Sequence, residues 1–205
     1  MKTNYDKILE DTINELKGHK PSLLLHSCCA PCSTAVITKL KDYFDVTIFY
    51  YNPNIEPLEE YLKRKEEQKR IVSEFGIKFL DCDYENEKFK DMSKGLEDLP
   101  EGGYRCHKCY ELRLTKTALT AKENNFLYFG TTLTVSPYKN SQVLNAIGKD
   151  IEELTNVKFL YSDFKKKEGY KLSIELSKKY NLYRQNYCGC IYSKKQSEQK
   201  LKCNL

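Results

Sequence analysis

The sequence predicts an α/β fold in three layers, with a mainly parallel sheet covered by helices on both faces. Three apolar segments, 22–27, 45–51 and 77–82, have the length and composition of buried strands. Between them lie two segments with helical periodicity, one ending at Lys41 and the other covering 58–75. A strand–helix–strand–helix–strand order is typical of a parallel sheet, because each helix returns the chain to the edge where the next strand begins.

The elements after residue 82 are less regular. Residues 85–103 are acidic and loop-like, and the polar tail 194–205 is expected to be frayed. No repeat, linker or low-complexity block divides the chain, so we expect a single α/β domain over residues 1–205. The remaining expected elements are helices at 106–124, 141–156 and 170–180 and strands at 126–134 and 158–161.

Size and charge restrict the possible partners and the cellular location. A chain of 205 residues can bury a core without disulfide or metal support. A net charge of +5 permits a polyanionic partner such as RNA without requiring one. The polar N-terminus is typical of an amphipathic helix, and no apolar run is long enough for a membrane span, so we expect a cytoplasmic protein without a membrane partner.

Seven of the nine cysteines fall into three closely spaced groups, each in or beside an expected loop. The groups are Cys28-Cys29-Ala30-Pro31-Cys32, Cys106-His107-Lys108-Cys109 and Cys188-Gly189-Cys190. The first group follows the first strand and enters a helix, at the edge where open α/β sheets bind ligands. A helix N-terminus favours the thiolate form, and thiols stay reduced in the cytoplasm, so the groups indicate metal binding or redox chemistry.

The spacing of the cysteines is compatible with either a zinc site or an iron–sulfur site. A zinc site takes four ligands and is then closed, whereas this chain offers seven thiols. The neighbouring Cys28 and Cys29 would more naturally serve different metals than one tetrahedral ion. An iron–sulfur cluster, with spare thiols for a second metal or for redox exchange, uses the seven better, and we favour it. Cys82 and Cys203 are expected to be structural or unused.

Nucleotide-binding signatures are absent from the sequence. It contains neither a GxGxxG motif nor a GxxxxGK[ST] motif. His26 directly precedes the first cysteine loop. A histidine bonded to backbone at the strand end and a histidine with a role near the metal remain equal alternatives.

Six sequence blocks together resemble the QueH-type epoxyqueuosine reductase family. The resemblance extends from about residue 23 to residue 193 and depends most on the CCxxC, EGGxRCxxCYxxRL and YRQxYCGC patterns. The blocks are HSCCAPCS (26–33), YYNPNIEPLEEYLKR (50–64), EGGYRCHKCYELRL (101–114), TTLTVSPYKN (131–140), SDFKKKEGY (162–170) and YRQNYCGCIYS (183–193).

The resemblance implies an activity, cofactors and partners. The family reduces the epoxide of epoxyqueuosine to queuosine at the wobble position of tRNA, without cobalamin. Its members carry a 4Fe–4S cluster with an additional iron nearby, so an external low-potential electron donor is expected. Their fold resembles the nucleotide-hydrolase-like (HUP) group, in which the loop after the first strand binds ATP phosphates. In this chain that loop is SCCAPCS and offers thiolates instead.

The resemblance also implies roles for individual residues. All seven grouped cysteines become metal ligands. We suggest that Cys29, Cys32, Cys106 and Cys109 hold the cluster and that Cys28, Cys188 and Cys190 hold the second iron, which would act as a Lewis acid on the epoxide oxygen. Tyr104, Tyr110 and Tyr187 are candidate proton donors, with packing as the alternative for each, and Tyr183 and Tyr187 are candidates for base stacking. The candidate RNA contacts are Arg64, Arg105, Arg113, Lys139, Lys165, Lys166 and Arg184.

Two other functions compete with the reductase. One is a zinc-stabilised, non-catalytic RNA-binding protein, which the cysteine spacing alone also allows. The other is a thiol-based sulfur transferase acting on tRNA. A sulfur transferase of this fold group needs an ATP-binding loop of the SGGxDS type, and residues 27–33 do not form one.

Overall fold

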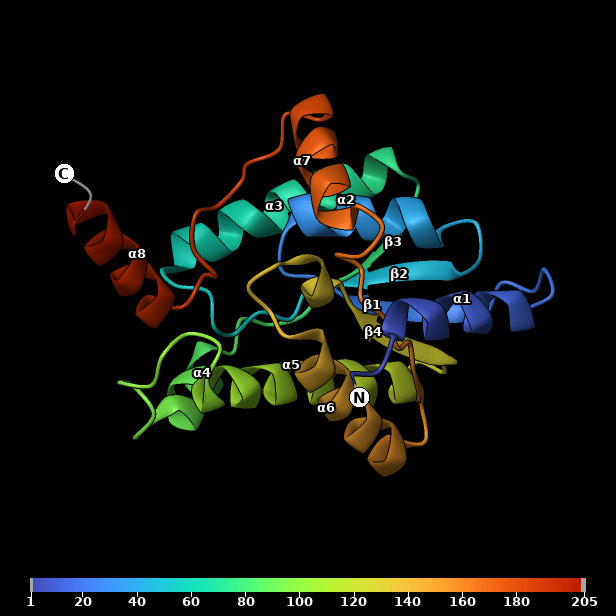
Figure 1. Cartoon of the computed structure of the whole chain (residues 1–205), viewed down its shortest axis with the longest axis horizontal. Coiled ribbons are helices and arrows are strands. Elements are labelled where there is room, and N and C mark those ends of the chain that lie inside the picture. Colours follow the sequence, from blue (N-terminus) through green and yellow to red (C-terminus); the bar gives the residue numbers. More distant parts are fainter. Residues whose placement is uncertain (1, 204–205) are drawn as a thin grey trace.

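Five strands form one parallel sheet in the order β3-β2-β1-β4-β5 (Figure 1), which confirms the predicted α/β fold. The computed structural model describes the backbone of residues 2–203 and the side chains of residues 2–199. His26 ends β1 and pairs with Phe49 of β2 and Thr131 of β4. The strand order reverses between β1 and β4, which is where open α/β sheets bind ligands. The strands are β1 Ser22–His26, β2 Asp45–Phe49, β3 Lys78–Leu80, β4 Tyr128–Thr131 and β5 Lys158–Phe159.

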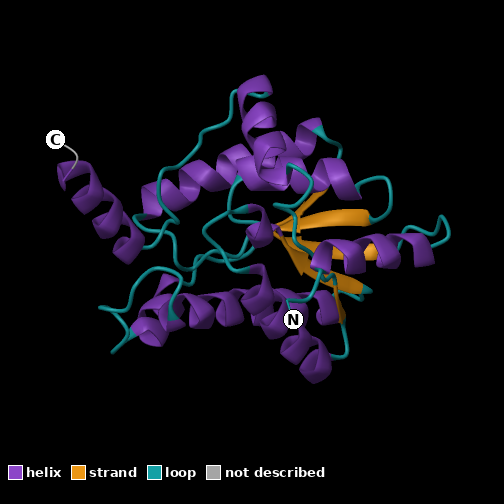
Figure 2. Ribbon diagram, viewed as in Figure 1, coloured by secondary structure: helices purple, strands orange, loops and turns teal. Residues whose placement is uncertain are grey.

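Helices cover both faces of the sheet, as Figure 2 shows. They are α1 Tyr5–Glu15, α2 Ala30–Leu40, α3 Leu58–Glu74, α4 Asn86–Ser93, α5 Tyr104–Glu123, the 3₁₀ helix η1 Thr132–Val135, α6 Ser141–Thr155, α7 Gly169–Lys179 and α8 Ile191–Cys203. Successive side chains of a strand point to opposite faces. Leu23 and Leu25 therefore pack in one core with α1, α2 and α3, whereas Leu24 packs in the other core with α5 and α6. Two buried layers result, and the loops between them meet at the strand ends.

Three expected segments differ most from the structure. The tail expected to be frayed over residues 194–205 is instead helical in α8 as far as Cys203, because Lys194 N–H donates to the Cys190 carbonyl and Tyr192 packs on Phe89 of α4. Residues 204–205 lie outside the described residues. The acidic segment expected to be a loop contains α4. The strand expected to continue to Thr134 ends at Thr131, whose hydroxyl accepts a hydrogen bond from the Leu133 N–H and starts η1. Among the described residues, no helix is long and apolar enough to cross a membrane.

Gly148 is required for the contact between α6 and β5. A Cβ atom at this position would lie 2.3 Å from the ring of Phe159, closer than any stable contact. We therefore expect Gly148→Ala to destabilise the fold by about 1–3 kcal/mol, the usual cost of overpacking a core. Urea unfolding followed by circular dichroism measures the change. Ala146→Ser, at an exposed position of the same helix, is the control, and equal unfolding midpoints for both variants would contradict the packing described here.

Candidate cysteine site

The three cysteine groups converge at the carboxyl edge of the sheet. Cys28 and Cys29 pack in the same side-chain cluster as Cys32 and Cys106, and Cys109 packs with Cys190 in an adjoining cluster. The Glu56 N–H donates to the Gly189 carbonyl at 2.9 Å, which joins the third group to the loop after β2. Among the described residues, no three His, Cys, Asp or Glu side chains stand together as a ready metal-binding group. The thiols come from three separate places: the loop that enters α2, the first turns of α5 and the loop before α8.

The side chain of Gln68, in α3, holds the first cysteine loop (residues 27–33) in place. The amide of this fully buried side chain accepts a hydrogen bond from the Ser27 hydroxyl at 2.9 Å and donates to the Ser33 hydroxyl at 2.8 Å. These two serines flank the cysteines of the loop, whose Cys28 and Cys29 sulfur atoms lie 3.8 Å apart. Unlike the cysteines, Gln68 was not expected as a site residue. A polar side chain on the buried face of an expected helix is the only signal that points to it.

A buried polar network joins the first loop to α5. Arg113 donates from Nε to His26 Nε2 at 3.2 Å and from its terminal nitrogen to Asn52 Oδ1 at 2.6 Å, and Asn52 Nδ2 donates to the Ser27 carbonyl at 2.8 Å. Burial, followed by the charge of Arg113, lowers the pKa of His26 to about 3, so the ring is neutral. His26 Nδ1 lies 3.0 Å from Thr131 Oγ1, and Nε2 lies 3.1 Å from the Tyr51 carbonyl, so both ring nitrogens have polar partners within the protein.

Arg64 of α3 holds the third cysteine loop. Its buried guanidinium donates to the Cys188 carbonyl at 3.0 Å and to Glu60 Oε1 at 2.6 Å. Gly189 has φ +129°, and a Cβ atom there would lie 2.9 Å from Ile55 and 3.2 Å from the Arg64 guanidinium, so only glycine fits. The Tyr187 ring lies against the Arg64 guanidinium, 5.2 Å away, and its hydroxyl donates to the Glu56 carbonyl at 3.2 Å.

The structure corrects the expected role of three arginines. Arg64, Arg105 and Arg113 are expected to contact RNA, but all three are buried, with 1–2% of their surface exposed. Arg105 donates to the carbonyls of Leu96, Glu97 and Leu99 and so holds the acidic loop before α5. In this conformation, the three guanidinium groups bind the protein's own loops and cannot reach a phosphate. The sequence shows the positive charge of these arginines but not their burial, and the expectation of RNA contact depended on charge alone.

The remaining expected RNA contacts are more accessible. Lys165 pairs with Asp163 at 3.0 Å and donates to the Lys139 carbonyl at 3.1 Å. Arg184 is exposed, and its guanidinium donates to the Ser173 carbonyl and the Ser177 hydroxyl, both at 3.0 Å.

Positive charge faces the thiols. Hydrogen bonds from the Cys29 and Cys32 thiols lower the pKa of Cys28, and the charges of Arg113 and Lys139 lower it further. Burial lowers the pKa of Lys139, but the charges of Cys188 and Cys28 outweigh burial and raise it overall. In the part of the chain that the structure describes, neither Arg113 nor Lys139 forms a salt bridge with a carboxylate. The site therefore has one buried and one half-buried cation, Arg113 and Lys139, whose nearest negative partners are thiolates.

Three of the other thiols, those of Cys29, Cys109 and Cys190, and the nearby phenol of Tyr110 have raised pKa values. Burial raises the pKa of Cys109 to about 11 and that of Cys190 to about 12. The hydrogen bond to Cys28 raises the pKa of Cys29 to about 11. The Tyr110 ring is buried beside these thiols, and burial also raises the pKa of its hydroxyl, so the phenol retains its proton. Tyr110 thus presents a protonated hydroxyl close to the thiol cluster.

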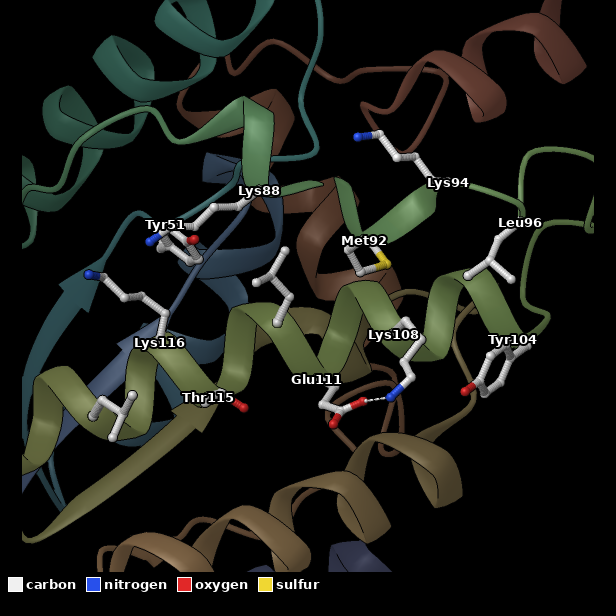
Figure 3. Close-up of a pocket in the computed structure, with 12 residues that line it drawn as sticks. Tyr51, Lys88, Met92, Lys94, Leu96, Tyr104, Lys108, Glu111, Thr115 and Lys116 are labelled. Carbon is white, nitrogen blue, oxygen red and sulfur yellow. Dashed lines mark hydrogen bonds and ion pairs between the residues drawn. The ribbon is translucent and has the colours of Figure 1, made fainter. Parts of the chain in front are cut away.

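A cavity of about 590 Å³ lies on the other side of α5, between α5 and α4 (Figure 3). Met92 and Leu112 line it and also pack against the cluster of Cys109 and Cys190. Lys108 and Glu111, which face the cavity, form a 2.7 Å ion pair. One layer of side chains therefore separates this cavity from the thiols.

Arg64 gives a direct test of how the third loop is held. We expect Arg64→Met to destabilise the fold by about 3 kcal/mol, because it leaves Glu60 and the Cys188 carbonyl without their buried partner. In metal-free protein, Cys188 should also react faster with iodoacetamide, which peptide mass spectrometry measures. The control Arg70→Met removes an exposed arginine of the same helix and should alter neither quantity. Unchanged labelling in Arg64→Met would show that Arg64 does not hold the loop.

The comparisons with known proteins agree on one family. The sequence model of "Epoxyqueuosine reductase QueH" matches residues 23–196. The chain is 46% identical over 202 residues to the epoxyqueuosine reductase QueH of Staphylococcus epidermidis, covering 94% of this chain and 85% of the relative. It is 39% identical to the protein of that name from Thermotoga maritima, covering 84% of this chain and 90% of the relative.

A solved structure shares the fold. The U34-tRNA thiolase NcsA from Methanococcus maripaludis, solved with its [4Fe-4S] cluster, superposes with a TM-score of 0.52 at 14% identity. The match covers 97% of this chain and 73% of the thiolase. At this identity the likeness supports the fold assignment.

Proposed function

This chain belongs to the epoxyqueuosine reductase QueH family, and from that membership we propose that it reduces tRNA-bound epoxyqueuosine at the cysteine site described above. One observation supports this location most strongly. Three groups of cysteines, seven residues in all, lie at the ligand-binding edge of the sheet, next to the buried Arg113 and the half-buried Lys139, which have no carboxylate partner among the described residues. Membership of a reductase family also argues against the alternative function, a non-catalytic RNA-binding protein.

The residues present fit an iron–sulfur cofactor. Thiolates are the ligands that hold such clusters, and the positive charges of Arg113 and Lys139 would offset the negative charge that thiolates and sulfide bring. Cys29, Cys32, Cys106 and Cys109 would hold a 4Fe–4S cluster, and Cys28, Cys188 and Cys190 would hold an additional iron. When bound, the two would supply single electrons and a Lewis acid for the epoxide oxygen. Cobalamin has no part in this proposal.

The chain's own residues have two tasks in this reaction, which are to donate a proton and to hold the site in position. Converting the epoxide to a carbon–carbon double bond breaks two C–O bonds and releases water, which takes two electrons and two protons. An external low-potential donor supplies the electrons. The protonated Tyr110 hydroxyl is the proposed donor of a proton to the leaving oxygen, and Tyr187 is the second candidate. Arg64 holds the loop of Cys188 and Cys190, and Gln68 and Arg113 hold the loop of Cys28 and Cys29, in position around the substrate.

A turnover assay tests the proposal. Anaerobically purified protein is incubated with dithionite and tRNA that carries epoxyqueuosine, and the digested nucleosides are identified by mass spectrometry. We expect queuosine to form, and we expect the protein to be brown, with iron and acid-labile sulfide. A colourless protein that contains one zinc ion per chain and forms no queuosine would refute the proposal.

A further inference from the structure

A second cavity of about 520 Å³ opens at the same edge of the sheet as the cysteine site. Three segments form its walls: the residues that lead into α1, the loop from η1 to α6, and the loop from β5 to α7. The two loops follow β4 and β5, and the first cysteine loop follows β1, so parallel strand order places all three at one edge. Figure 1 shows the amino terminus beside α6, where the first and second segments meet. The lysines that line this cavity are Lys2, Lys139, Lys165, Lys166 and Lys167.

Positive charge exceeds negative charge in this lysine cavity. The carboxylates that line it are Asp6 and Asp163, and both are already paired. Asp163 binds Lys165 at 3.0 Å and accepts a hydrogen bond from the Ser141 hydroxyl at 2.9 Å, and Asp6 pairs with Lys167 at 3.6 Å. Among the described residues, Lys2, Lys139 and Lys166 have no carboxylate within salt-bridge distance. The excess of positive charge favours an anion over a neutral or cationic ligand in this cavity.

Lys139 connects the lysine cavity to the cysteine site. Its carbonyl accepts the hydrogen bond from Lys165, while its half-buried side chain lies within electrostatic reach of Cys28 and Cys188. An anion bound in the cavity is thus only one residue away from the thiols. A tRNA that places its modified base among the thiols brings with it the backbone phosphates on either side of that nucleotide. One of these phosphates can then enter the neighbouring cavity. This continuity favours a phosphodiester of the substrate over a free anion.

We propose that the lysine cavity binds a backbone phosphate that flanks the modified nucleotide of tRNA, with Lys2 and Lys166 as its principal contacts. The inference rests on the proposed function, because it takes tRNA as the substrate. Phosphate contacts position a nucleic acid without reading its sequence, so the cavity sets how far the modified base enters the cysteine site.

The test measures binding of the holoprotein to an unmodified tRNA transcript, by fluorescence anisotropy under anaerobic conditions over a range of salt concentrations. Lys2→Ala and Lys166→Ala should each weaken binding about five-fold, the upper range for one exposed ion pair. The slope of log Kd against log salt should fall by roughly 0.7–0.9 for each lysine removed. Lys122→Ala is the matched control, because Lys122 is exposed in the last turn of α5, at the opposite edge of the sheet.

Three results would overturn the proposal: unchanged tRNA affinity in both variants, an equal loss in Lys122→Ala, or weaker binding of inorganic phosphate without weaker binding of tRNA. Failure of the proposed function has a different signature. In that case tRNA binding would still depend on Lys2 and Lys166, while wild-type protein with dithionite would form no queuosine.

Discussion

Cys188→Ala protein should lose more than about 100-fold of its queuosine-forming activity, since even an outer contact of a metal site contributes 10–100-fold. The reason is geometric as well as chemical. Cys188 lies in the loop that Arg64 and Gly189 hold against the loop after β2, and its thiol is within electrostatic reach of Cys106 and Cys109. Anaerobic turnover and the iron content of the purified variant are the measurements.

Cys82→Ala is the matched control for that variant. The Cys82 thiol is half-buried outside the three groups and donates to the Tyr50 carbonyl at 3.0 Å. Its removal should leave both iron content and turnover close to those of wild-type protein. Full activity in Cys188→Ala, or an equal loss in Cys82→Ala, would show that the site is assigned to the wrong thiols.

Arg113→Gln should have the second large effect, because it removes a buried charge and two hydrogen bonds at once. The loss of the bonds to His26 and Asn52 is expected to destabilise the fold by about 2–3 kcal/mol, the range for bonds to charged groups. Without the guanidinium charge, a reduced and therefore more negative cofactor is less stable, so its midpoint potential should fall. Urea unfolding and anaerobic redox titration measure the two effects.

Arg113→Lys separates the two contributions of Arg113. It retains the positive charge but lacks the planar group that bonds both neighbours, so its potential should stay closer to that of wild-type protein while stability is still lost. An unchanged potential in Arg113→Gln would contradict the assigned charge compensation, whatever the change in stability.

The parallel sheet and the seven grouped cysteines could be predicted from the sequence, because both appear in it as local patterns. Buried strands such as 22–27 are continuous apolar runs, and thiol spacing is visible without a structure. Helix α8 was missed because its stability comes from contacts of Tyr192 with Phe89 and Ser93, far away in sequence, and not from its own polar residues.

The positions of the arginines were the least predictable feature. Arg64 and Arg113 occur in cysteine-rich motifs of a basic chain, and their charge suggested RNA. Only the packing of α3 and α5 against the sheet shows that their guanidinium groups face inward and bind loop carbonyls and amides. Asn52 and Gln68, which complete this support, differ from ordinary surface residues only by their burial.

Single-turnover reduction is the most direct measurement of chemistry at the cysteine site. Anaerobic holoprotein is reduced with dithionite, freed of excess reductant and mixed with at most half an equivalent of tRNA that carries epoxyqueuosine, because each cluster supplies one electron and the reaction takes two. Paramagnetic resonance and nucleoside analysis follow the same samples. We expect queuosine to appear as the signal of the reduced iron–sulfur centre disappears, with neither change in Cys188→Ala. Queuosine formed while that signal stays constant, or formed by protein without iron and sulfide, would contradict reduction at this site.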